Sequence, residues 1–162
     1  MNIRETKLSD LDSIMKIYEH ARAFMAEQGN PDQWGTSYPP EELIIDDIRN
    51  RKSYVCEENE QVVGTFCYEF GENIEPSYNT IINGHWSKNS PYGVIHRIAS
   101  IGTVKGVAKY CVEWAFSRCG YMRIDTHPSN AIMQIFLNKS GFRYCGVIRL
   151  ERDNTIRLAF DK

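Results

Sequence analysis

The stretch from Val94 to Ala115 constrains the fold more than any other part of the chain, because it combines a strand, a turn and a helix. Its first residues form an apolar run typical of a buried strand, and Ile101-Gly102-Thr103 predicts a tight turn. Gly106 marks the start of a helix, where unpaired N–H groups and a partial positive charge favour an anion such as a diphosphate. Apolar residues then recur at the three-and-four spacing of an amphipathic helix: Ala108, Cys111, Val112, Ala115 and Phe116.

Length and charge limit the classes of protein to consider. A chain of 162 residues predicts one domain, over residues 1–162. Its formal net charge is -2, and its basic residues are scattered apart from a small cluster at Arg49, Arg51 and Lys52. Binding to phosphate backbones needs clustered Lys and Arg, so we expect no nucleic-acid partner.

The cysteines and the N-terminus indicate a cytoplasmic protein. The five cysteines are odd in number, dispersed and mostly set in apolar patterns, as expected of reduced structural thiols. Residues 1–10 lack the apolar core of a signal peptide, and no run reaches transmembrane length, so we expect no membrane partner. The histidines share no ligand spacing, which argues against a metal site.

Patterns along the rest of the chain predict α/β (α+β) architecture, a mixed six- to seven-stranded sheet with about four helices on both faces. The order is β-α-α-β-β-(β)-β-α-β-α-β-β. The helices are expected from Ser9 to a breaker cluster near Gly29, from Pro40 to Arg49, from Gly106, and from Pro128 to Ser140. Strands are expected at residues 2–7, 53–56, 61–70, 94–100, 122–126, 143–150 and 155–160. Residues 71–93 are the least regular, with an extra strand expected at 78–82.

Three features together resemble the GNAT superfamily of N-acetyltransferases over essentially the whole chain. They are the strand order, the strand-turn-helix block with Gly106-Val107-Ala108, and the block from Asn130 to Gly141-Phe142. The family's pyrophosphate motif begins with Gln or Arg, whereas Thr103 stands there in this chain. Backbone amides survive that change, while a side-chain contact to phosphate does not.

The resemblance implies that acetyl-CoA binds along the central strand and at the turn that follows it. Ile98, Ala99 and Ser100 are then expected to pair with the pantetheine arm. The amides of Lys105, Gly106, Val107, Ala108 and Lys109 are expected to hold the diphosphate, although the two lysine side chains could equally be solvated helix charges. Asn130, Met133 and Phe136 are expected to line the cofactor channel.

For catalysis, the residues leave alternatives open. His96 is a candidate base, since imidazole takes up a proton near neutral pH, and it is equally compatible with a core histidine bonded to a carbonyl. Glu69 is the other candidate base, with a solvated edge charge as its alternative. The family's acid is a Tyr before the Gly-Phe pair, and Leu137 stands at that position. Tyr78 and Tyr144 are possible replacements, Asp125 and His127 are possible orienting groups, and Cys111 is expected to be inert.

We expect the acceptor between the first two helices and residues 71–93. An aromatic wall is predicted there, with Glu69, Glu72 or Glu75 available to attract an amine: Tyr18, Trp34, Tyr38, Tyr78 and Trp86. The predicted function is acetyl transfer to a primary amine of a small molecule or peptide by direct attack on the thioester through a tetrahedral intermediate, and a homodimer is left open. The alternatives are a non-catalytic acyl-CoA-binding module and an interaction scaffold. A nucleotide-binding βαβ protein is disfavoured because GxGxxG and GK[ST] motifs are absent.

Overall fold

The structure, a computed structural model that describes residues 1–162, contains one seven-stranded sheet. The strands lie in the order β1-β2-β3-β4-β5-β7-β6, and all neighbouring pairs are antiparallel except β4 and β5. Their bounds are β1 Asn2–Glu5, β2 Ser53–Glu58, β3 Gln61–Gly71, β4 Tyr92–Ser100, β5 Met122–Thr126, β6 Arg143–Arg149 and β7 Ile156–Asp161. The mixed sheet confirms the predicted fold class.

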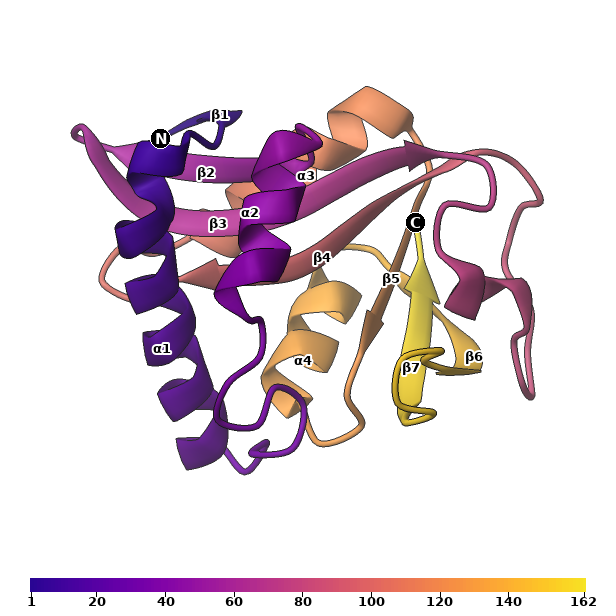
Figure 1. Cartoon of the computed structure of the whole chain (residues 1–162). Coiled ribbons are helices and arrows are strands. Elements are labelled where there is room, and N and C mark those ends of the chain that lie inside the picture. The colour runs from indigo at the N-terminus through magenta and orange to yellow at the C-terminus, as the bar shows by residue number, and fades with distance from the viewer.

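Four α-helices cover the two faces of the sheet: α1 Leu11–Glu27, α2 Glu41–Arg49, α3 Val107–Cys119 and α4 Ala131–Lys139. Neighbouring residues on β2 point to opposite faces, so Val55 packs with α1 and α2 while Cys56 packs on the side of α3. In α1 the buried stripe is Ile14, Ile17 and Tyr18, at the spacing that turns one helix face to the core. Figure 1 shows these helices arranged around the long strands β3 and β4.

Strand β4 has a bulge in its pairing with β3 and is paired with β5 over only two residues. Thr65 pairs with Ala99 and Cys67 pairs with His96, so β4 has one residue more than β3 between those pairs. Arg97 absorbs this extra residue with a φ of 54°. Toward β5, only Gly93 and Val94 have strand partners, and the two strands then separate (Figure 1). The β5-facing edge of β4 from residue 95 onward is therefore free of a neighbouring strand.

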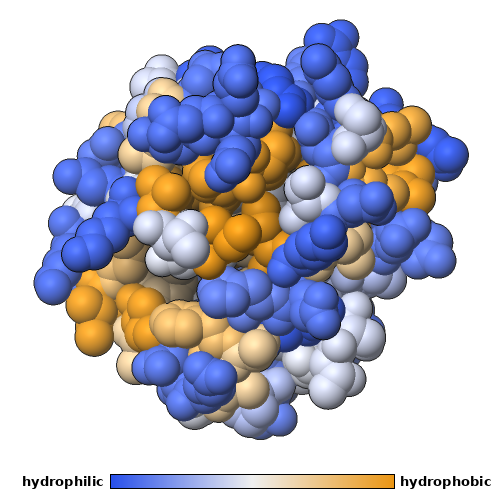
Figure 2. Space-filling model, turned by 90° about the vertical axis from the view of Figure 1, so that its left-hand side faces the viewer, coloured by the Kyte–Doolittle hydropathy of each residue, from blue (hydrophilic) through white to orange (hydrophobic).

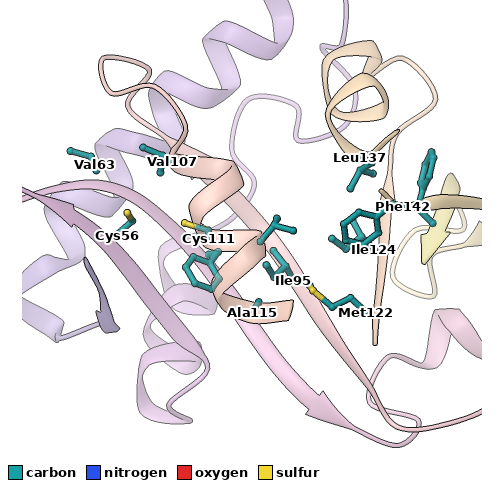
Figure 3. Close-up of a cluster of buried hydrophobic side chains, with 13 residues drawn as sticks. Cys56, Val63, Ile95, Val107, Cys111, Ala115, Met122, Ile124, Leu137 and Phe142 are labelled. Atoms are coloured by element: carbon teal, nitrogen blue, oxygen red, sulfur yellow. The ribbon is translucent and has the colours of Figure 1, made fainter. Parts of the chain in front are cut away.

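The largest core cluster fixes the start of α3 against the sheet. A Cβ on Gly64 would lie 2.5 Å from Val107 Cγ1, so glycine at position 64 allows the first turn of α3 to pack directly on β3. Leu137 of α4 is completely buried in the same cluster, beside Phe142 and Ile124 (Figure 3). The turn between β4 and α3 is thus anchored at its helical end by core packing.

Residues 71–93 differ from the prediction. The extra strand expected at 78–82 is wrong in extent, because Pro76–Asn79 form a 3₁₀ turn and only Ile82 makes an isolated bridge, to Val147. Pro76 is preorganised for the first position of a helical turn, and the Glu75 side chain caps that turn by accepting from Ser77 N. The helix expected from Ser9 begins instead with a 3₁₀ turn, Leu8–Asp10.

The two β-α-β units, β4-α3-β5 and β5-α4-β6, differ in how their strands are placed. β4 and β5 are adjacent and parallel, whereas β7 lies between β5 and β6 and is antiparallel to both. None of the helices combines the length and apolar character that crossing a membrane requires.

Candidate active site

The turn between β4 and α3 presents a row of free backbone donors. No N–H group from Gly102 to Lys109 donates to an acceptor within the protein, and the first helical bond of this region runs from Tyr110 N to Gly106 O. Gly102 and Gly106 hold left-handed φ values of 81° and 84°, and no atom lies within 4 Å of a Cβ placed on Gly106. Such a row at a helix N-terminus suits an anion with several oxygens.

The lysine side chains contribute less to this turn than its amides. Lys109 Nζ lies 3.7 Å from Glu113 Oε1 one helical turn away, and the Lys105 side chain is exposed. Val107 is buried in the core, while Gly102 and Ala108 line a large pocket. Of the residues predicted to hold the diphosphate, only Ala108 lines the pocket, and the two lysine side chains lie outside the lining.

A pocket of about 680 Å³ continues from this turn into the gap between β4 and β5. Its walls include Ile95–Ser100 of β4, Ile124–Thr126 of β5, and Met133 and Phe136 of α4. Figure 2, which views the molecule from the left-hand side of Figure 1, shows apolar side chains gathered in the middle of that face and hydrophilic ones around them. A long ligand with amide groups would find an open strand edge on one side and apolar contacts on the other.

Asn130 ties this pocket to the loop after α1. Its Oδ1 accepts from Met133 N at 3.1 Å, which caps α4, and its Nδ2 donates to Gln33 Oε1 at 2.9 Å. Gln33 also accepts from Asn30 Nδ2 at 2.8 Å. The role of Gln33 was missed in the sequence, because a lone Gln in an irregular loop gives no signal of its partner.

His96 faces a carboxylate inside the pocket. Its Nε2 lies 3.2 Å from Glu75 Oε2, and each side chain is 22% exposed. Burial acts to raise the pKa of Glu75, but the contact with His96 and the hydrogen bond from Ser77 N outweigh it and hold that pKa at about 2. Glu75 is therefore ionised at neutral pH and can orient the imidazole.

Asp125 joins this group from β5. Tyr78 Oη donates to Asp125 Oδ2 at 2.8 Å, and Arg157 Nε lies 4.0 Å from Asp125 Oδ1. Burial raises the pKa of Asp125, while the charge of His96 and the Tyr78 hydroxyl act in the opposite direction. Arg157 was also missed, although a charge between apolar residues on the inward face of the last strand was a usable signal.

The predicted aromatic wall is only partly present. Trp34 and Tyr38 line the pocket. Tyr18 lies behind Trp34, with ring centroids 5.7 Å apart, and its hydroxyl donates to Arg97 O at 3.0 Å. Tyr78 is buried with Asp125 as its partner. Trp86 is a correction: it lies outside the pocket lining, because its N–H donates to Tyr78 O and the Arg123 guanidinium lies over its ring.

Glu69 also lies outside the pocket lining. Its Oε2 forms an ion pair with Lys52 Nζ at 2.7 Å. Glu69 stands near the end of β3, whereas the turn before α3 lies near the start of that strand. Of the two bases considered, the structure brings only His96 to the pocket.

The other candidates for proton transfer have structural partners. Leu137 points into the core rather than the pocket, and Tyr144 packs against Phe160 on the exposed side of β6. His127 Nδ1 accepts from Ser129 N at 3.1 Å, which stabilises the turn before α4. Burial lowers the pKa of His127. None of these three side chains lines the pocket.

Comparisons with known proteins agree with this geometry. No family model matches the sequence, and no curated protein matches it. A GNAT-family acetyltransferase structure from Streptococcus agalactiae is 33% identical, with a TM-score of 0.88, over 99% of this chain and 94% of its own. A GNAT-family acetyltransferase from Listeria monocytogenes is 15% identical, with a TM-score of 0.70, over 99% and 93%.

A further match, yncA from Salmonella typhimurium, was solved with its cofactor acetyl-CoA. It is 15% identical to this chain, with a TM-score of 0.64, over 99% of this chain and 92% of its own. At this identity, the Listeria and Salmonella structures support the fold alone. The Streptococcus structure is similar in sequence as well as fold over nearly the whole of both chains. The chain therefore belongs to the GNAT family of acetyltransferases.

Proposed function

We propose that the protein transfers the acetyl group of acetyl-CoA to the primary amine of a small molecule or peptide. One observation carries this proposal: the open edge of β4 and the His96–Glu75 pair lie in one pocket, and this pocket reaches Gly102 and Ala108 in the segment of free amides from Gly102 to Lys109. A phosphate site alone fits many ligands. A phosphate site joined to an unpaired strand edge and a basic group fits a thioester carrier whose acyl end must meet an amine.

Acetyl-CoA has a matching partner for each of its parts. The diphosphate would accept hydrogen bonds from the amides of the turn and of the first turn of α3. The amides of the pantetheine arm would pair with β4 between Ile95 and Ser100, as an added strand pairs with a sheet edge. Met133 and Phe136 would contact its apolar segments. With the diphosphate at the turn, an arm paired along β4 toward Ile95 would bring the thioester near His96.

His96 is the proposed base for the acceptor. An ammonium must lose a proton before its nitrogen attacks the thioester carbonyl, and a carboxylate-oriented imidazole can accept that proton. With Nε2 donating to Glu75, Nδ1 is the basic nitrogen. The nitrogen–carbon bond forms, the carbon–sulfur bond breaks, and the electron pair leaves on the CoA sulfur. The nitrogen then loses its extra proton, and the CoA thiolate takes up one proton to become the free thiol. A thiol of pKa about 8.5 is a competent leaving group as its anion, so this route works with Leu137 in place of an acidic tyrosine.

Leu137 is also the observation that favours a second function, a non-catalytic acyl-CoA-binding module. Its side chain is 0% exposed and contributes to the core instead of the pocket. A chain that only binds acyl-CoA would need the amides and the strand edge but no groups for proton transfer. The presence of the His96–Glu75 pair at the acceptor end favours catalysis over this alternative.

Three measurements on the same protein separate the two functions. Calorimetric titration with acetyl-CoA tests binding, release of free thiol tests turnover, and mass spectrometry of a mixed amine and peptide library identifies the acetylated product. We expect turnover that falls at least about 100-fold in His96→Gln, with acetyl-CoA binding retained, in line with the usual contribution of a general base. Tight binding without turnover on any amine would establish the binding module instead.

A further inference from the structure

Arg157 is a buried cation whose hydrogen-bonding capacity is only partly used. It is 3% exposed and lines the pocket. Its Nη1 donates to Thr155 Oγ1 and to Ile156 O, each at 2.9 Å. Its Nε and Nη2 donate to no acceptor in the protein. A guanidinium offers five N–H donors in a planar fork, so three of them remain for a ligand.

The nearest carboxylate does not satisfy Arg157. Asp125 Oδ1 lies 4.0 Å from Arg157 Nε, beyond hydrogen-bond distance, and the other oxygen of Asp125 accepts from Tyr78. Burial lowers the pKa of Arg157 despite the nearby charge of Asp125. Asp125 therefore compensates the charge of Arg157 but accepts none of its hydrogen bonds. Buried donors without acceptors are costly, so the unused donors of this guanidinium inside a pocket indicate an anionic acceptor supplied by the ligand.

A second arginine lies near this end of the pocket and is already paired with a carboxylate. Arg152, in the turn between β6 and β7, lines the same pocket and lies over the Tyr38 ring at 4.0 Å from the ring centroid. Its Nε donates to Asp153 at 3.1 Å. Arg97 also lines the pocket, but its guanidinium pairs with Asp47, so it is already compensated. Glu151, the neighbouring carboxylate at this rim, is exposed.

Negative charge lies on the other side of Asp125, where the Glu75 carboxylate contacts His96. The His96 and Tyr78 ring centroids are 6.5 Å apart, and the Tyr78 hydroxyl donates to Asp125. Asp125 in turn lies beside Arg157, so these four side chains are neighbours in that order. Glu75 is ionised beside His96. The pocket therefore presents Glu75 and His96 on one side of Asp125 and the unused donors of Arg157 on the other.

We propose that the acceptor is an amino acid, whose carboxylate binds Arg157 while its amine is directed to His96 and Glu75. This inference rests on the proposed acetyl transfer and names its substrate class. A carboxylate accepts two parallel hydrogen bonds from the Nε and Nη2 side of a guanidinium, which fixes its orientation as well as its position. The N-terminus of a peptide lacks this carboxylate and loses that contact.

Matched acceptors test the proposal. Each of several amino acids is compared with its carboxamide and with its decarboxylated amine, which share the amine and side chain but lack the anion. The variants are Arg157→Gln, which removes the charge, and Arg157→Lys, which keeps the charge without the fork. Arg149→Gln is the matched control, because Arg149 is an exposed arginine of the adjacent strand β6, outside the pocket lining.

We expect kcat/KM for the acids to exceed that for the amides at least about 10-fold in the natural protein, as expected for a charge-assisted bidentate contact. This preference should disappear in Arg157→Gln, be partly kept in Arg157→Lys and remain in Arg149→Gln. Because acids and amides are compared within one variant, a general loss of folding or activity cancels. Equal or better use of the amides by the natural protein would overturn the proposal and leave acetyl transfer standing.

Titration of the same acids and amides into the CoA-loaded protein, followed by tryptophan fluorescence or calorimetry, provides a readout that needs no turnover. Binding of acids but not amides, lost in Arg157→Gln, supports the proposal even if thiol release is absent and the transferase function fails. Equal binding of both, or binding of neither, contradicts it.

Discussion

Replacing Glu75 by glutamine removes the stabilisation that the contacts with His96 and Ser77 give to a half-buried carboxylate. Burial opposes ionisation of Glu75, yet the contacts with His96 and Ser77 lower its pKa from the ordinary 4.5 to about 2. At about 1.36 kcal/mol for each tenfold change in an acidity constant, the lowering corresponds to about 3 kcal/mol of stability. The pKa of Glu75 is lower in the folded protein than in the unfolded chain. The full stabilisation is therefore present at pH values above the unfolded pKa of 4.5, and it is lost as the pH falls toward the folded pKa of about 2.

The assay is urea unfolding of the natural protein and of Glu75→Gln, compared at pH 7 and pH 3. The linkage relation leaves about 1.4 kcal/mol of the contribution at pH 3, so the difference in unfolding free energy between the two proteins should narrow by about 2 kcal/mol. Effects of the substitution that do not depend on pH cancel in this comparison. Glu72→Gln, which replaces an exposed carboxylate of the same loop, is the control. A difference that stays constant from pH 7 to pH 3 would refute the pairing of Glu75 with His96.

Three further substitutions test the remaining parts of the site. Gly106→Ala should cost about 1 kcal/mol because alanine must adopt the left-handed φ of 84°, and it should raise KM for acetyl-CoA; an unchanged KM would remove the turn from the binding site. Leu137→Tyr should lower stability by about 1–3 kcal/mol in urea unfolding without raising kcat, since the position is completely buried; a faster enzyme would show that a tyrosine there reaches the pocket. Asn130→Ala should destabilise by about 1 kcal/mol and weaken acetyl-CoA binding in titration, whereas the exposed Asn138→Ala on the same helix should do neither.

The elements of the proposed cofactor site could be predicted because their signals are local in sequence. Gly106 and Asn130 each act at the first turn of a helix, and a helix start is marked by residues a few positions apart. His96 was identified by its place on the central strand. The same reasoning could not choose between His96 and Glu69, since a period of two leaves open which strand residue meets a partner of opposite charge.

The acceptor side depended on contacts between distant segments. Glu75 meets His96 from an irregular loop, and Arg157 reaches the same pocket from the last strand. Trp86 belonged to the predicted wall by composition, but a cation–π contact with Arg123 holds it elsewhere. Residues in loops without a period carry no information about the direction of their side chains, so sequence reasoning placed the aromatic residues only approximately.

The sequence by itself determined the order of the elements, the α/β class and the glycine-containing turn before α3, because hydrophobic periodicity and helix termini are properties of short segments. Tertiary structure alone decided which strand edge stays open, which carboxylate orients His96, and that Leu137 fills the core while Arg157 faces the pocket. Those outcomes depend on packing between segments far apart in the chain. The block from Val94 to Ala115 supplied β4, the turn with free amides and α3. The loop before β4 and the β6–β7 hairpin supplied the charged residues Glu75 and Arg157 of the pocket.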